Sequence, residues 1–190
     1  QVPASIGNLN DLQIISLSQN TLTGRPIEFV NTSSSPTLEI LSLASNIFIG
    51  LVPESISKFL NLGDISLCEN NFSGPIPRSI SKLVNLHDLN LGDNNLEGQY
   101  QLAYGLTTVT LSKNFFSSFE NQTLIEALDL NSNSFQGPLP HWICNTKGLR
   151  FLDLSNNLFN GFIPPCLKNS IVSLNDLILR NNSFSGPLPT

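Results

Sequence analysis

Apolar residues recur along this chain in a unit that fits neither a continuous helix nor a continuous strand. The stretch from Leu62 to Val84 shows the unit most clearly. Ile65 and Leu67 alternate with other residues as in a short strand, and the chain then turns back through Gly74 and Pro77. Such a unit has one apolar edge that it cannot bury alone, so it must stack against other copies of itself.

The chain contains those copies. An asparagine follows two alternating apolar residues at eight places, which are Asn20, Asn46, Asn70, Asn94, Asn114, Asn133, Asn157 and Asn182. The intervals between them are 26, 24, 24, 20, 19, 24 and 25 residues, which is the period of leucine-rich repeats. This regularity predicts a solenoid with one coil per asparagine.

Each position of the coil has a physical role. Parallel strands stacked about 4.8 Å apart form a sheet, and their inward Leu and Ile side chains build a core that neighbouring coils share. Burial of each such side chain contributes roughly 1.5–3 kcal/mol. We expect the asparagine to point inward and to bond backbone groups of its own bend and of the next coil. Its loss is then expected to cost about 1–3 kcal/mol.

A second signature follows the asparagine in most coils. A glycine precedes a proline by three residues at 50–53, 74–77, 137–140, 161–164 and 186–189. With this signature the chain resembles the plant-type leucine-rich repeat, LxxLxLxxNxLxGxIPxxLxxL. The resemblance implies a mainly β, right-handed solenoid that twists into a superhelix, with a parallel sheet on its concave face. It also implies short 3-10 or irregular segments, and a second short strand before each proline.

The coils of Asn94 and Asn114 depart from this pattern. The segment after Gly98 has no proline, and residues 115–119 replace the glycine segment altogether. We therefore expect the second set of strands to be interrupted in these two coils.

The sequence predicts one array over residues 1–190, with about eight repeats. Both ends fall inside a coil, and neither has the polar capping unit that solenoids need. The chain is therefore expected to be an uncapped slice of a longer ectodomain.

Composition argues against several classes of function. The net charge of −5 disfavours nucleic acid as a partner, because nucleic acid requires a basic face. No apolar run is long enough to span a bilayer, so membrane attachment would use a segment that is not in this chain.

His87 and His141 lie in different coils without a catalytic motif, and no metal-spaced cluster or phosphate-binding loop occurs. We expect no enzyme activity, no cofactor and no metal.

The three cysteines allow one bridge. Cys144 and Cys166 follow Pro140 and Pro164 at four and two residues, in adjacent coils. Coils about 5 Å apart match the Cα separation of a disulfide, so we predict this bond and an oxidising compartment. Cys68 takes a position that is serine in other coils and is expected to be a free thiol.

Four N-glycosylation sequons occur, at Asn31, Asn71, Asn121 and Asn181. An Asn- and Ser-rich chain produces some sequons by chance. Together with the predicted disulfide, they favour a secreted glycoprotein.

A recognition surface is expected on the outer face of the strands, because alternation turns the residues beside the leucines outward. The candidate ligand-binding residues are Asp64, Ser66, Asp88, Asn90, Thr108, Thr110, Asp129, Phe151, Asp153, Asp176 and Ile178. The acidic members would accept a basic or polar peptide, and Phe151 and Ile178 would anchor an apolar side chain. The equal alternative is that Asp and Ser are the ordinary solvent-facing residues of these positions.

Further phrases resemble the ectodomains of plant receptor-like proteins: residues 78–86, His141-Trp-Ile-Cys144, and 163–169 together with 179–182. The resemblance implies a receptor without a kinase at the extracellular face of the plasma membrane or in the apoplast. It implies a microbial or endogenous protein or peptide ligand, defence or developmental signalling, and receptor-kinase co-receptors as partners. The alternatives are a secreted inhibitor similar to polygalacturonase inhibitors and, third, a structural wall or ice-associated protein.

Overall fold

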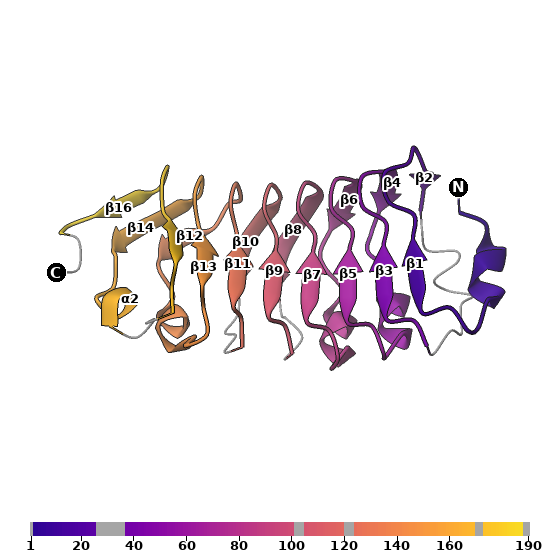
Figure 1. Ribbon diagram of the computed structural model, residues 1–190. Helices are drawn as coiled ribbons and strands as arrows, with labels where there is room; N and C mark the ends of the chain where they lie inside the picture. The colour runs from indigo at the N-terminus through magenta and orange to yellow at the C-terminus, as the bar shows by residue number, and fades with distance from the viewer. Residues whose placement is uncertain (1, 26–36, 101–104, 120–123, 170–172, 188–190) are drawn as a thin grey trace.

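The computed structural model is an elongated stack of coils, in which each coil contributes one strand to a parallel sheet (Figure 1). It describes residues 2–25, 37–100, 105–119, 124–169 and 173–187. The sheet has eight strands in the order β1-β3-β5-β7-β9-β11-β13-β15. The prediction of a mainly β solenoid with a stacked parallel sheet is confirmed.

The strands of this sheet have three residues each and pair in a constant register. They are β1 (Ile14–Ser16), β3 (Ile40–Ser42), β5 (Asp64–Ser66), β7 (Asp88–Asn90), β9 (Thr108–Thr110), β11 (Ala127–Asp129), β13 (Phe151–Asp153) and β15 (Asp176–Ile178). The middle residue points into the core and is buried in every strand from Ile15 to Leu152. Leu177 in β15, the last strand in the order of the sheet, is 40 % exposed.

A second set of strands lies behind the first in Figure 1. Five strands pair in one group: β2 (Thr23–Gly24), β4 (Ile47–Gly50), β6 (Asn71–Gly74), β8 (Asn95–Tyr100) and β10 (Phe115–Phe119). Three more form a separate group: β12 (Gln136–Pro138), β14 (Leu158–Phe162) and β16 (Ser183–Ser185).

The predicted interruption in the coils of Asn94 and Asn114 is wrong. Strands β8 and β10 of these coils pair with each other, and β8 extends over six residues. Without a proline, every residue of these segments keeps the backbone N–H that a ladder uses, so nothing ends the strands early. The register between β8 and β10 is irregular between Phe116 and Ser118, and the pairing breaks directly after β10, before β12.

Short helices return the chain on the side away from the eight-stranded sheet. The 3-10 helices are η1 (Ala4–Asn8), η2 (Glu54–Lys58), η3 (Arg78–Lys82) and η4 (His141–Asn145), and a short α-helix, α2 (Cys166–Asn169), follows. A proline with extended backbone precedes each 3-10 helix. Pro77, for example, has φ −65° and ψ 133°. The glycine–proline signature therefore ends the second strand and starts the helix.

The core runs the length of the stack between the two sets of strands. Leu and Ile side chains fill most of it, and a column of phenylalanines lines the second set. The rings of Phe48 and Phe72 stack with centroids 6.3 Å apart, and those of Phe135 and Phe159 stack at 5.9 Å. These aromatic pairs link consecutive coils.

The repeated asparagines form a hydrogen-bonded ladder inside the stack. The Asn70 Nδ2 donates to the carbonyls of Leu67 and Cys68 in its own bend and to Leu43 one coil earlier. The Asn70 Oδ1 accepts from the backbone N–H of Phe48, also one coil earlier. The inward orientation is as expected, but the bonds between coils go to the preceding coil and not to the next one.

The residue before each of these asparagines has a left-handed backbone, although none is glycine. The positions are Gln19, Ser45, Glu69, Asp93, Lys113, Ser132, Asn156 and Asn181, with φ between 53° and 57°. The backbone N–H of Glu69 donates to Gly92 O, and that of Ser45 to Cys68 O, each in the following coil. These bonds between coils hold a conformation that such residues adopt infrequently.

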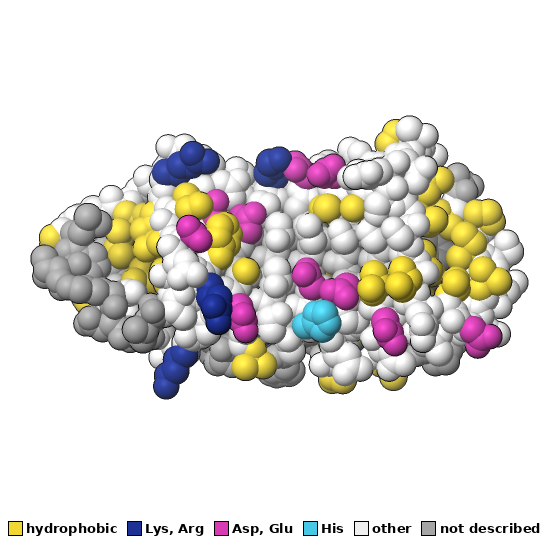
Figure 2. Space-filling view, viewed as in Figure 1, with side chains coloured by type: hydrophobic (Ala, Val, Ile, Leu, Met, Phe, Trp, Pro, Cys, Tyr) yellow, Lys and Arg dark blue, Asp and Glu magenta, His cyan; other side chains and the backbone are white. Residues whose placement is uncertain are grey.

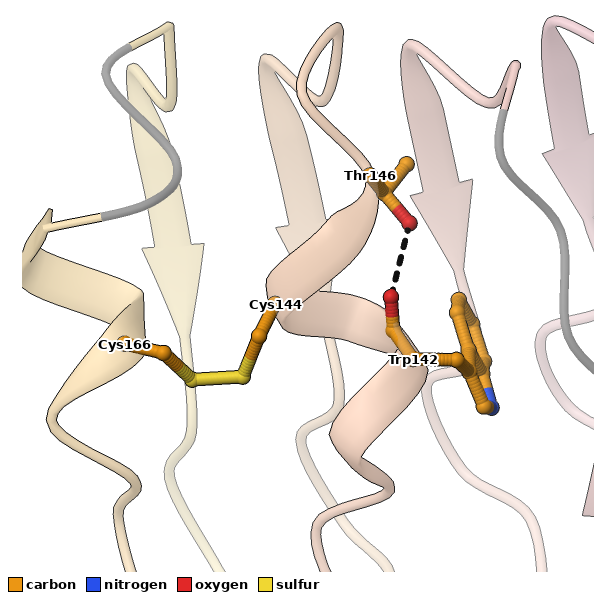
Figure 3. The surroundings of a disulfide bond; sticks show 4 residues. All are labelled: Trp142, Cys144, Thr146 and Cys166. Atoms are coloured by element: carbon orange, nitrogen blue, oxygen red, sulfur yellow. Dashed lines mark hydrogen bonds between the residues drawn. A yellow bond between two sulfur atoms is a disulfide. The ribbon is translucent and has the colours of Figure 1, made fainter.

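The predicted disulfide is present. Cys144 in η4 and Cys166 in α2 are bonded, with Cα atoms 5.5 Å apart (Figure 3). The hydroxyl of buried Thr146 donates to the backbone carbonyl of Trp142, which closes the same turn. Cys68 is a free, partly buried cysteine, and its sulfur lies 3.5 Å from the Ser66 hydroxyl.

Candidate ligand-binding face

The eleven candidate residues lie together on the outer face of the eight-stranded sheet. Strand register places them in two rows that cross the strands. The first outer row is Asp64, Asp88, Thr108, Ala127, Phe151 and Asp176, and the second outer row is Ser66, Asn90, Thr110, Asp129, Asp153 and Ile178. Figure 2 shows acidic side chains gathered at separate places on this face, with apolar side chains beside them.

The first acidic place contains Asp64 and Asp88, which are register partners on adjacent strands. Burial raises the pKa of the Asp88 carboxyl, the negative charge of Asp64 raises it further, and His87 lowers it. The Nδ1 atom of His87 lies 3.7 Å from Asp64 Oδ1. A cation that reaches this place would relieve the repulsion between two neighbouring carboxylates.

The His87 imidazole lies over Gly63. The ring can come this close because glycine has no side chain. A Cβ atom at Gly63 would stand 2.9 Å from His87 Nε2. Beside the two residues is an open groove of about 480 Å³, also lined by Glu39, Asn61 and Asp64. His87 and Glu39, which were not among the eleven predicted residues, are therefore additions to the candidate face.

The second acidic place contains Asp129 and Asp153, again register partners. The pKa of the Asp129 carboxyl is raised, mainly by burial. Hydrogen bonds from the Asn131 backbone and the Ser112 hydroxyl oppose this rise. The negative charge of Asp153 adds to it, and the positive charge of Lys113 opposes it. The Asn131 N–H donates to Asp129 Oδ1 at 2.9 Å. The Ser155 hydroxyl and N–H both donate to Asp153 Oδ1. These bonds hold both carboxylates in defined positions on the face.

Apolar side chains border the second acidic place. Phe151 is partly exposed in the first outer row, and its register partner on β15 is Asp176. Ile178 is partly exposed beside Asp153 in the second outer row. An apolar group and a cation would therefore find neighbouring contacts here.

The edge of the same sheet has a row of polar side chains that sequence analysis did not predict. They occupy the left-handed positions before the repeated asparagines. Lys113 Nζ lies 2.6 Å from Asp93 Oδ2, and the Ser45 hydroxyl donates to Glu69 at 2.8 Å. The only available signal was their constant place in the repeat, which does not reveal that their side chains meet between coils.

Of the four sequon asparagines, Asn71 and Asn181 are described. Asn71 is exposed at the start of β6, and Asn181 is exposed at a left-handed position. Asn31 and Asn121 lie outside the described residues.

Within the described ranges, no group of three or more His, Cys, Asp or Glu side chains is arranged to hold a metal ion. The same part of the chain contains no helix with the length and apolar character needed to cross a membrane.

Four segments of the chain match the family model described as Leucine Rich Repeat. They are residues 37–59, 61–83, 124–146 and 148–170. Receptor-like protein 31 of Arabidopsis thaliana is 57 % identical over 98 % of this chain. The chain spans 22 % of that relative's length.

Two solved structures of the Arabidopsis receptor kinase HAESA share the fold. Its ectodomain in complex with an N-terminal extended IDA peptide hormone is 30 % identical, with a TM-score of 0.90 over 99 % of this chain and 32 % of that one. HAESA with the peptide hormone IDA and the co-receptor SERK1 is 32 % identical, with a TM-score of 0.67 over 99 % of this chain and 28 % of that one. The present chain is a leucine-rich-repeat protein of the plant type, and over its length it resembles the ectodomain of plant receptor-like proteins.

Proposed function

We propose that this chain is the extracellular ligand-recognition part of a plant cell-surface receptor, and that it binds without catalysis. The observation that carries the proposal is the alignment of acidic, polar and apolar side chains in two continuous rows across β5, β7, β9, β11, β13 and β15. A solved relative of the same fold, the HAESA ectodomain, carries a peptide hormone.

The ligand that fits best is an extended peptide with a basic or polar side chain and an apolar one. Six strands spaced about 4.8 Å apart cover about 24 Å, the length of about seven extended residues. Its cationic group would contact Asp129 and Asp153, and its apolar group would contact Phe151 or Ile178. Because burial disfavours the charged form of Asp129, a cation at this place gains more than it would beside a fully solvated carboxylate.

We further propose that the array belongs to a longer ectodomain at the outer face of the plasma membrane, attached through a segment outside residues 1–190. The disulfide between Cys144 and Cys166 supports an oxidising, extracellular location. A receptor-kinase co-receptor is the proposed signalling partner, since the HAESA complex contains a co-receptor. The ligand is proposed to be microbial or endogenous.

The test begins with capture of a ligand from apoplastic extracts on the immobilised ectodomain, followed by mass spectrometry. The affinity of the identified peptide is then measured for Asp129→Lys and Asp153→Lys and for the control Asp11→Lys, whose site is exposed outside the sheet face. We expect at least a tenfold weaker Kd for the first two variants and an unchanged Kd for the control. Unchanged affinity in all three would contradict the proposal. Inhibition of a polygalacturonase would instead favour the secreted-inhibitor alternative.

A further inference from the structure

Asn71 has the properties of an N-glycosylation acceptor. It stands first in the sequon Asn71-Phe72-Ser73 and is exposed at the start of β6. Among the described residues, none forms a hydrogen bond with its side-chain amide. The nitrogen to which a sugar would be joined therefore faces solvent.

The other described sequon has a different geometry. Asn181 Nδ2 donates to Asn156 Oδ1 at 2.7 Å, in the neighbouring coil. A sugar on that nitrogen would crowd the contact between two coils. The two sequons share their residue types, but only the fold distinguishes the exposed amide of Asn71 from the bonded amide of Asn181.

An apolar patch lies directly beside Asn71, formed by Ile47, Ile49 and Leu51. These side chains are 47 %, 49 % and 55 % exposed. Ile49 on β4 is the register partner of Asn71 on β6, and Figure 1 shows these strands next to each other. Leu51 reaches toward the same strand, since a Cβ atom at Gly74 would meet its Cδ2 at 2.5 Å.

The opposite side of Asn71 is polar. Strand β6 pairs there with β8, and the register places Ser73 beside Asn95. Asn71 therefore stands at the border between an apolar patch and a polar surface. A flexible group attached to it reaches the exposed aliphatic side chains of Ile47 and Ile49 by lying over β4.

We propose that Asn71 is N-glycosylated and that the first sugars of its glycan cover the patch of Ile47, Ile49 and Leu51. The C–H faces of the sugars would contact the aliphatic side chains, while their hydroxyl groups stay in water. The glycan thereby removes exposed apolar area that otherwise promotes association between molecules. This inference uses the extracellular location of the proposed function, because N-glycosylation takes place in the secretory pathway.

The covalent step needs a lipid-pyrophosphate-linked oligosaccharide as co-reactant. The Asn71 Nδ2–C1 bond forms with the first N-acetylglucosamine, and the bond from C1 to the pyrophosphate oxygen breaks. The lipid pyrophosphate leaves with that electron pair, and the amide nitrogen loses one proton.

Glycan occupancy of Asn71 is tested by secreting the chain from eukaryotic cells with an added signal peptide. The signal peptide brings the chain into the secretory pathway, so the result does not depend on the proposed extracellular location. Glycopeptide mapping should find a glycan on Asn71, and Ser73→Ala should abolish it. The matched control Ser183→Ala removes the Asn181 sequon and should leave the glycan on Asn71 in place. An unmodified Asn71 in the secreted chain would overturn the proposal, whatever the outcome of the ligand-binding test.

Shielding is tested by enzymatic removal of the glycan from the folded protein. We expect the deglycosylated chain to bind an apolar dye at least twofold more strongly and to self-associate in light scattering. The double variant Ile47→Thr/Ile49→Thr should suppress both increases, because the patch is then polar without a glycan. If deglycosylation changes neither measurement, the glycan does not cover the patch and that part of the proposal fails.

Discussion

The Asn94 Oδ1 accepts a hydrogen bond from the backbone N–H of Phe72 across 2.9 Å, although the two residues belong to different coils. Asn94 is 5 % exposed, and its Nδ2 donates to the carbonyls of Leu67, Leu91 and Gly92. One amide thus satisfies the bend of its own coil and ties that coil to the preceding one. The same arrangement recurs along the stack, so the coils are joined by polar bonds inside an apolar core.

The first prediction concerns this ladder. Asn94→Ala should lower the free energy of unfolding by about 2–3 kcal/mol, because it leaves buried backbone groups unpaired. Asn20→Ala is the matched control, since the exposed Asn20 side chain donates to Leu17 and Ser18 in its own bend and, among the described residues, to no other coil; it should cost about 1 kcal/mol or less. Urea denaturation followed by circular dichroism measures both. Equal losses would show that the bonds between coils add nothing.

The second prediction uses two adjacent phenylalanines with opposite environments. Phe116 is fully buried, whereas Phe115 is 58 % exposed. Phe116→Ala should cost about 3–5 kcal/mol through lost burial and a cavity, and Phe115→Ala should change stability by about 0.5 kcal/mol or less. Thermal and urea unfolding of the two variants provide the comparison. A large loss in the Phe115 variant would mean that this side chain is not exposed as described.

The third prediction concerns the disulfide between Cys144 and Cys166, which are 22 residues apart. Replacing both residues with serine should lower stability by about 3 kcal/mol, because the bond restricts the unfolded chain over this loop. The single variant Cys68→Ser should leave the disulfide intact and unfold under the same conditions as the parent. Calorimetry of oxidised protein and the variants tests this expectation. A double variant as stable as the parent would contradict it.

The fourth prediction follows from the raised pKa of Asp129, whose principal cause is burial. The pKa of Asp129 is higher in the folded state than in the unfolded state. At a pH between these two pKa values, the carboxyl is therefore mostly protonated in the folded state and mostly ionised in the unfolded state. The contribution of Asp129 therefore favours folding below the unfolded pKa and is lost as the pH rises through the folded pKa. Asp129→Asn should remove this dependence and unfold at higher urea than the parent at pH 7, with a smaller advantage at pH 3. An equal difference at both pH values would argue against a raised pKa.

Sequence spacing was sufficient for the parts of the fold that repeat locally. Two alternating apolar residues followed by an asparagine, repeated about every 24 residues, determine a coil that must stack. From this the inward column through Ile65 and Leu89 follows, and so does the outer face with Asp129 and Asp153. The Cys144–Cys166 pair was predictable for the same reason, since the repeat brings equivalent positions together.

Tertiary structure alone decided how neighbouring coils meet. It set the direction of the bonds from Asn70, placed the break of the second sheet after β10, and laid His87 over Gly63. It also left the amide of Asn71 exposed while that of Asn181 bonds Asn156. The physical reason is that each of these features depends on side chains about 20 to 25 residues apart. A repeat pattern places such residues side by side, but it does not determine which of their atoms touch.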